Sequence, residues 1–269
     1  MDIATIGGIL LALVSLIVAF SGEGGALGSL VQPTAALIVF GGTIGATVAS
    51  ATMRQILNVG KYLKVAFFYK TEDPLTIIEG LVSLATTARR EGILALEEQI
   101  ESFDDEFLQK GIQSIVDGVD PELVKTMMTT ELDYIEERHK AGAKVFELAG
   151  GYAPTLGIIG TVMGLVHVLG NLKNVSALGP QIATAFTATL YGVSSANIIW
   201  LPIAYKLKRR NAEEVLTREI MIEGVLSIQA GENPQILRQK LVAFLPPKAR
   251  IAKAKASDTE AGEVDAETI

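Results

Sequence analysis

The sequence predicts an all-α polytopic membrane protein with four transmembrane helices and a cytoplasmic helical domain. The 269 residues are 49% hydrophobic, and the mean hydropathy of +0.38 is high for a soluble protein. The apolar residues gather in segments free of Asp, Glu, Lys and Arg, each near the 20 or so residues that cross a bilayer. Those segments are residues 3–21, 30–52, 148–172 and 174–205.

The first two segments form a pair of membrane helices joined by a short turn at 21–29. A signal peptide is disfavoured for 3–21, because Asp2 stands where Lys or Arg would precede the apolar run, and the run is longer than usual. In the second segment Gly41 and Gly45 form a small-xxx-small pair, for which we expect a helix-packing role.

Residues 54–143 are polar and have the apolar periodicity of amphipathic helices. Asp73-Pro74 begins one helix, with apolar side chains at Leu75, Ile78, Leu81 and Ala85; Gly92 interrupts it, and Asp104 is a candidate cap for the next. Asp120-Pro121 begins a helix that we expect to continue into the membrane near Leu148. The predicted domains are transmembrane helices 1 and 2 (1–53), the cytoplasmic helical domain (54–143), transmembrane helices 3 and 4 (144–206), C-terminal helices (207–247) and a disordered tail (248–269).

The distribution of Lys and Arg predicts the orientation. Both 54–144 and the KLKRR run at 206–210 are rich in them, whereas the loops at 21–29 and 173–179 contain only Lys173. The positive-inside rule therefore places both termini and the helical domain in the cytoplasm, and the protein in a bacterial inner membrane.

The third and fourth segments are rich in small and hydroxylated residues, which suits helices that pack closely around a polar path. Thr161 and Thr189 lie within small-residue stripes and could offer oxygens to a cation. The alternative is that each hydroxyl bonds to its own backbone one turn earlier. The stripes are Pro154, Gly157, Thr161 and Gly164 on one helix, and Ala185, Thr189, Gly192 and Ala196 on the other.

Pro154 and Pro202 interrupt the backbone hydrogen bonding of these two helices, so we expect a kink at each and interpret them as points of conformational coupling. No Asp or Glu occurs between residues 148 and 205 or between 24 and 53. Since a cation in a bilayer core usually needs a carboxylate, either the chain conducts no ions or a partner supplies one. We expect His167, the one titratable group at membrane depth, to be interfacial rather than a proton relay.

Composition excludes several other functions. The chain has no Cys and two His residues, and no nucleophile–base set, metal cluster or phosphate loop, so we expect neither an enzyme nor a resident metal or cofactor, and no nucleic-acid partner. In the cytoplasmic domain Arg89, Arg90 and Glu97 flank Gly92. They are either solvated charges on a helical hairpin or a contact surface for another protein.

The order of these features, with the motifs ARREGILALEEQIE, GGYAPTLGIIGTVMGL, ATLYG followed by LP, and EIMIEGVLSIQAGENP, resembles the A subunit of the bacterial flagellar motor stator. This is the MotA/PomA/MotP family within the MotA/TolQ/ExbB superfamily, and the resemblance extends from Met1 to about Pro247.

The resemblance implies a ring of five A subunits around a dimer of a single-span, MotB-type B subunit that supplies the membrane Asp. It implies that transported Na⁺ or H⁺ drives rotation, and that the cytoplasmic domain pushes the rotor protein FliG. By motif, Arg89, Arg90 and Glu97 correspond to rotor-contacting charges. Pro154 and Pro202 correspond to prolines of the conformational cycle. Thr161 and Thr189 correspond to hydroxyl positions of sodium-driven members, which favours sodium.

Two alternatives stay open on the sequence alone. One is an ExbB/TolQ-type energiser of envelope transport, although those relatives have three spans and an external N-terminus. The other is a membrane scaffold that conducts nothing.

Overall fold

The computed structural model describes residues 3–68, 73–100, 103, 105–170 and 175–247, and the tail predicted at 248–269 lies outside these ranges. The described residues form helices and turns and no strand. Four helical stretches are long and apolar enough to cross a membrane: Ala4–Gly22, Leu27–Ser50, and parts of Pro121–Gly170 and Leu178–Gln229. The predicted all-α class and four spans are confirmed.

The chain divides into two compact units, each built from two separate stretches of sequence. Unit 1 comprises Met1–Lys70 and Glu137–Asn211, and unit 2 comprises Thr71–Glu136 and Ala212–Ile269. Unit 1 thus contains all the charge-free segments, together with the residues from 54 to 70.

The first half of unit 1 begins with helix α1 (Ile3–Gly22). A 3₁₀ turn, η1 (Leu27–Leu30), precedes the second span, which consists of α2 (Pro33–Ala36), a π-helical turn η2 (Leu37–Gly41) and α3 (Gly42–Ser50). The short helices α4 (Met53–Leu57) and α5 (Val59–Phe68) follow. A capping box, in which Thr52 and Gln55 satisfy each other's backbone N–H groups, starts α4.

The π-turn changes which glycines pack. Within this chain the predicted pair makes no close contact with another helix: a Cβ on Gly45 would meet nothing within 4 Å, and one on Gly41 would meet only Leu37 of the same helix, at 3.5 Å. Gly42 makes the close contact instead, 3.0 Å from Leu156 by the same measure. A π-turn holds an extra residue, so the faces after it are rotated relative to a regular α-helix.

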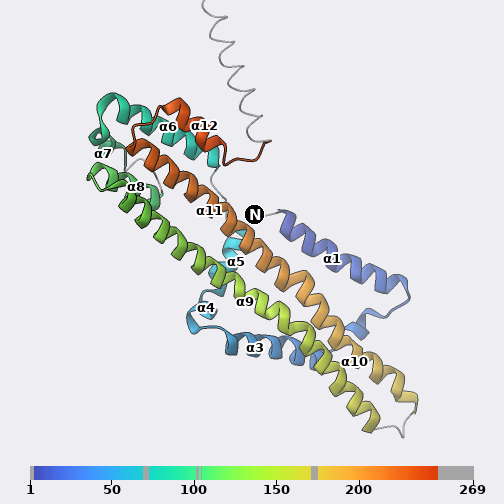
Figure 1. The fold of residues 1–269 in the computed structure, drawn as a ribbon. Helices are drawn as coiled ribbons and strands as arrows, with labels where there is room; N and C mark the ends of the chain where they lie inside the picture. Colours follow the sequence, from blue (N-terminus) through green and yellow to red (C-terminus); the bar gives the residue numbers. More distant parts are fainter. Residues whose placement is uncertain (1–2, 69–72, 101–102, 104, 171–174, 248–269) are drawn as a thin grey trace, which may run out of the picture. The chain divides into compact units, whose positions relative to one another are not determined.

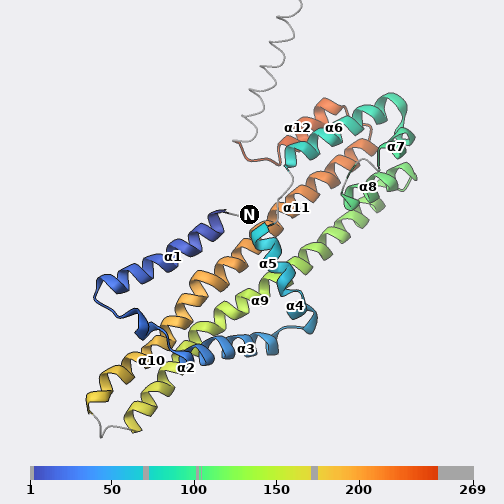
Figure 2. The same ribbon diagram turned by 180° about the vertical axis from the view of Figure 1, so that it is seen from behind.

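The second half of unit 1 consists of long helices. Helix α9 (Pro121–Gly170) is continuous over 50 residues, which confirms the predicted helix from Pro121 past Leu148. It is followed by α10 (Val175–Ser195), a second π-turn η4 (Ala196–Trp200) and α11 (Leu201–Gln229). Figures 1 and 2 show α9 and α10 side by side in both views.

Tyr191 ties the start of the second span to α10. Its hydroxyl donates to the carbonyl oxygen of Leu30 and accepts the backbone N–H of Gln32 at 3.1 Å. These backbone groups lie just before α2, where no helical hydrogen bond satisfies them. A side chain far away in sequence therefore fixes the beginning of α2.

Unit 2 has its own hydrophobic core. It is formed by α6 (Pro74–Glu91), 3₁₀ turn η3 (Ile93–Leu96), α7 (Glu97–Ile100), α8 (Glu106–Val116), α12 (Pro234–Val242) and the unit's parts of α9 and α11. Figure 1 shows α6 beside α12. The side chains with almost no exposure include Ile78, Leu81, Leu84, Ile112, Val225, Leu237 and Leu241.

Side-chain caps define the helix starts in unit 2. Asp73 caps α6 by accepting the N–H of Leu75 at 3.0 Å, as predicted. Asp105 caps α8, because its carboxylate accepts from the N–H groups of Phe107 and Leu108 at 2.8 and 3.1 Å. The candidate cap Asp104 lies outside the described residues.

Candidate functional site

Helices α9 and α10 cross in unit 1 with their backbones almost in contact. A Cβ on Gly192 would lie 2.5 Å from the carbonyl oxygen of Ala153, and one on Gly157 would lie 2.9 Å from that of Ala188. Real side chains do not approach backbone this closely, so both positions require glycine. The small-residue stripes predicted on the two helices therefore face each other here.

Thr161 and Thr189 meet at this crossing. Their hydroxyl oxygens are 2.5 Å apart, and Thr161 Oγ1 also lies 3.1 Å from the carbonyl oxygens of Gly157 and Ala185. Thr189 Oγ1 is 3.4 Å from the Gly157 oxygen. Thr161 is buried at 9% exposure, so the crossing gathers four oxygens in a small volume largely shielded by protein.

In this cluster some lone pairs of the Thr161 and Thr189 hydroxyl oxygens accept no hydrogen bond. Each hydroxyl has one proton and two lone pairs, so two protons serve all the contacts of Thr161 and Thr189. The Thr161 hydroxyl reaches the carbonyl of Gly157 one turn earlier, as the backbone-bonding alternative expects, and it also contacts Thr189 on the facing helix. A cation could be offered lone pairs here, but no negative charge.

A cavity of about 400 Å³ adjoins the crossing through Gly164 and Ala185, which belong to both. His167, expected at the interface, lines it together with Gln181 and Thr184. Within the described part of the chain, the buried Gln181 Oε1 has no hydrogen-bond partner. Sequence reasoning missed Gln181, although its place eight residues before Thr189, on nearly the same helix face, was the available signal.

The two prolines have different surroundings. Helix α9 is continuous through Pro154. Pro202 is the second residue of α11 and lies two residues after the last residue of the π-turn η4. Because proline has no N–H, the carbonyl of Ile198 lacks the donor it would have in a regular α-helix. Ile198 lies within the π-turn η4, which is wider than an α-helical turn. The backbone thus has a wider turn close to Pro202, and the coupling role of the two prolines stays a prediction.

In unit 2, Arg89 and Arg90 lie in the last turn of α6 and Glu97 begins α7, and all three side chains are exposed. Between them Gly92 ends α6 with φ +92°, a conformation that favours glycine. Arg90 lies 3.4 Å from Glu91, but both side chains are more than half exposed, so this pair contributes at most about 1 kcal/mol. The charges form a solvated edge rather than part of the fold's core.

Comparisons with known proteins agree with this architecture. The family model described as motility protein A N-terminal matches residues 6–92, and the MotA/TolQ/ExbB proton channel family model matches 99–220. Motility protein A of Bacillus subtilis is 43% identical over 98% of both chains, and chemotaxis protein PomA of Vibrio alginolyticus is 38% identical over 91% of this chain and 96% of its own.

Solved structures show the same fold. One chain of the flagellar MotAB stator complex from Bacillus subtilis superposes with a TM-score of 0.88 at 42% identity, covering 93% of this chain and 98% of its own. A chain of C. jejuni MotAB also gives 0.88, at 32% identity, covering 92% and 97%. The chain therefore belongs to the motility protein A family, within the MotA/TolQ/ExbB proton channel family.

Proposed function

We propose that the chain is the A subunit of a flagellar stator, which couples ion flow across the inner membrane to torque on the rotor. The observation that carries this is the pair Thr161 and Thr189, 2.5 Å apart at a backbone-tight crossing of two charge-free helices. Similarity to motility protein A and to MotAB stator structures supports it. The role is mechanical and conductive, not enzymatic.

The ion site is completed by a partner. The oxygens at the crossing can bind a cation but cannot offset its charge, and no Asp or Glu lies between residues 148 and 205 or between 24 and 53. The similar structures are of MotA with MotB, which supports a single-span B subunit with a membrane Asp as partner. We place the A subunit in a ring of five around a B dimer.

Sodium is the proposed ion, because Na⁺ prefers several oxygen ligands and the crossing gathers two hydroxyls and two carbonyls. Swimming speed should rise with external sodium at fixed pH and should survive a protonophore. Thr161→Ala and Thr189→Ala should each reduce sodium-dependent speed severalfold. The matched control is Thr126→Ala, which removes an exposed hydroxyl bonded to the carbonyl of Glu122 outside the membrane.

Two results would contradict parts of this proposal. Speed that ignores sodium and collapses with the protonophore would assign the proton instead. Ion flux that is absent when the chain is co-expressed with its partner, in a preparation that is otherwise assembled, would favour the non-conducting scaffold.

Both termini are proposed to be cytoplasmic. The exposed edge formed by Arg89, Arg90 and Glu97 is the proposed contact with the rotor protein FliG. Reversing Arg90 and Glu97 together should abolish torque while leaving membrane assembly intact. Reversing Glu122 and Lys125, also exposed in unit 2, is the matched control and should swim normally. Normal torque and rotor recruitment in the first variant would disprove this contact surface.

A further inference from the structure

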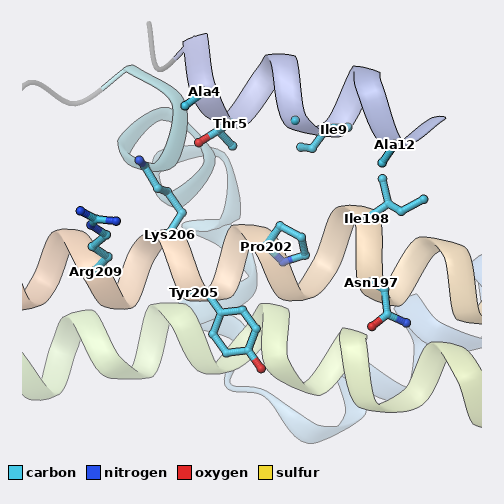
Figure 3. Close-up of a pocket in the computed structure, with 11 residues that line it drawn as sticks. Ala4, Thr5, Ile9, Ala12, Asn197, Ile198, Pro202, Tyr205, Lys206 and Arg209 are labelled. Carbon is cyan, nitrogen blue, oxygen red and sulfur yellow. The ribbon is translucent and has the colours of Figure 1, made fainter. Parts of the chain in front are cut away.

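A groove of about 410 Å³ lies between α1 and the start of α11, entirely within unit 1. Figure 3 shows one wall formed by α1, with Ala4, Ile9 and Ala12 labelled, and the other by Ile198 and Pro202. Its volume is within the about 300–1,000 Å³ of ordinary ligand sites. Nothing in the proposed ion pathway uses it.

The groove exists because α1 presents small residues where it faces α11. Ala4, Gly8 and Ala12 recur every four residues on one helix face and line the groove. A Cβ on Gly8 would meet nothing within 4 Å, whereas one on Gly157 at the α9–α10 crossing would meet backbone. Glycine thus brings α9 and α10 into backbone contact, whereas between α1 and α11 it leaves open space.

Two cationic side chains stand at one end of the groove. Lys206 and Arg209, three residues apart on α11, line that end, while the rest of the wall is mainly apolar. Lys208, between them, points elsewhere and forms an ion pair with Glu147 of α9. The cations of the basic run therefore point in different directions around α11. Lys208 joins α11 to α9, and Lys206 and Arg209 line the groove.

The groove is cationic at one end and mainly apolar along the rest of its length, which matches the anionic headgroup and the acyl chain of a phospholipid. By the positive-inside rule, Lys206 and Arg209 lie at headgroup depth in the cytoplasmic leaflet. The wall toward Ala12 and Ile198 is mainly apolar, with Asn197 as a neutral polar residue there, and it belongs to charge-free spans. An anionic phosphate would meet the cations, and an acyl chain would cover apolar surface that α1 leaves unpacked.

We propose that this groove binds one anionic phospholipid of the inner leaflet, with its phosphate on Lys206 and Arg209 and an acyl chain between α1 and Pro202. The lipid fills the space between α1 and α11 and holds α1 to the rest of unit 1. The proposal concerns the membrane mounting of the chain and stands whether or not the chain conducts ions.

The test is photolabelling of the full-length chain in phosphatidylcholine vesicles that contain a minor fraction of phosphatidylglycerol. The probe is phosphatidylglycerol with a photoactivatable acyl chain, and its crosslinks are mapped by mass spectrometry. Crosslinks are expected at residues 4–12 and 197–202. Labelling there should fall about 25-fold in a Lys206→Gln, Arg209→Gln variant, a factor of about five for each cation.

Three controls accompany the test. Lys61→Gln with Lys64→Gln removes two exposed cations of α5 that do not line the groove, and it should label as the wild type does. Gly8→Leu fills the groove and keeps the cations, and should also lose labelling; the open space at Gly8 lets the fold accept it. A phosphatidylcholine probe with the same acyl chain should label weakly, and equally in the wild type and the double variant.

Several outcomes would overturn the proposal. The first is equal phosphatidylglycerol labelling of the wild type and the Lys206, Arg209 variant. The second is loss of labelling when inorganic phosphate is added, which would indicate a site for a free anion. The third is disulfide formation between Gly8→Cys chains and Ile198→Cys chains mixed in one membrane, which would place a second copy of this chain in the groove.

Discussion

Replacing Gly192 with Ala tests the backbone contact that brings the two threonines together. The new Cβ would lie 2.5 Å from the carbonyl oxygen of Ala153, and ordinary contact begins at 3.4 Å, so the helices must separate locally by up to 0.9 Å. Such overpacking costs about 3 kcal/mol at its upper range. The gain in helix propensity from Gly to Ala returns about 1 kcal/mol, which leaves a net loss of about 2 kcal/mol.

The measurement is thermal unfolding of the chain assembled with its partner, together with ion flux. A net loss of about 2 kcal/mol should lower Tm by about 4–8 °C for a chain of this size. The same separation would stretch the Thr161–Thr189 hydroxyl contact from 2.5 Å toward about 3.4 Å and weaken the shared oxygen cluster, so flux should fall as well.

Gly151→Ala is the matched control on α9, because a Cβ there would meet nothing within 4 Å. It should leave flux unchanged and raise stability by up to about 1 kcal/mol. If Gly192→Ala unfolds at or above the wild-type temperature and conducts normally, the close approach of α9 and α10 is refuted.

Two further predictions concern side-chain contacts. Tyr191→Phe should lower the free energy of unfolding by about 1–3 kcal/mol, because backbone groups of Leu30 and Gln32 lose their hydrogen-bond partner. Chemical denaturation measures this change. An unchanged denaturation midpoint would show that water replaces the hydroxyl. Lys240 has a pKa raised above 10.5 by its hydrogen bond with Glu223, at 2.5 Å. This pair should therefore add up to about 1 kcal/mol below pH 10.5 and lose it as pH rises through the folded-state pKa, so the Tm gap to Lys240→Gln should close in alkali.

The spans and the crossing faces could be predicted from sequence because they depend on local rules. A charge-free run of membrane length is a span. Residues three, four and seven apart share a helix face, which correctly grouped Gly157 with Thr161 on α9, whereas their direct contact with Thr189 is seen only in the structure. The absence of Asp and Glu between residues 148 and 205 could be read directly from the order of the residues.

The failures have a common physical origin in geometry that periodicity does not encode. The π-turn Leu37–Gly41 rotates the following face, so Gly42 packs instead of the predicted Gly41 and Gly45. Which carboxylate reaches the first N–H groups of α8 depends on the local backbone, and Asp105 reaches them, whereas the candidate Asp104 lies outside the described residues. The KLKRR run was visible as a charge signal, but which cations face which neighbour depends on tertiary structure.

The discontinuity of both units has a consequence for how the protein is made. The first stretch of unit 2 leaves the ribosome long before its complement, because the 75 residues of Glu137–Asn211 come between them. At a synthesis rate of about 5–20 residues per second, that interval is about 4–15 s. During this interval the apolar face of α6, with Ile78, Leu81 and Leu84, has been made, but α12, which packs in the same core, has not. A nascent chain halted after Asn211 would therefore contain all the charge-free segments but only the first stretch of unit 2, and the apolar face of α6 would stay uncovered until α12 was made.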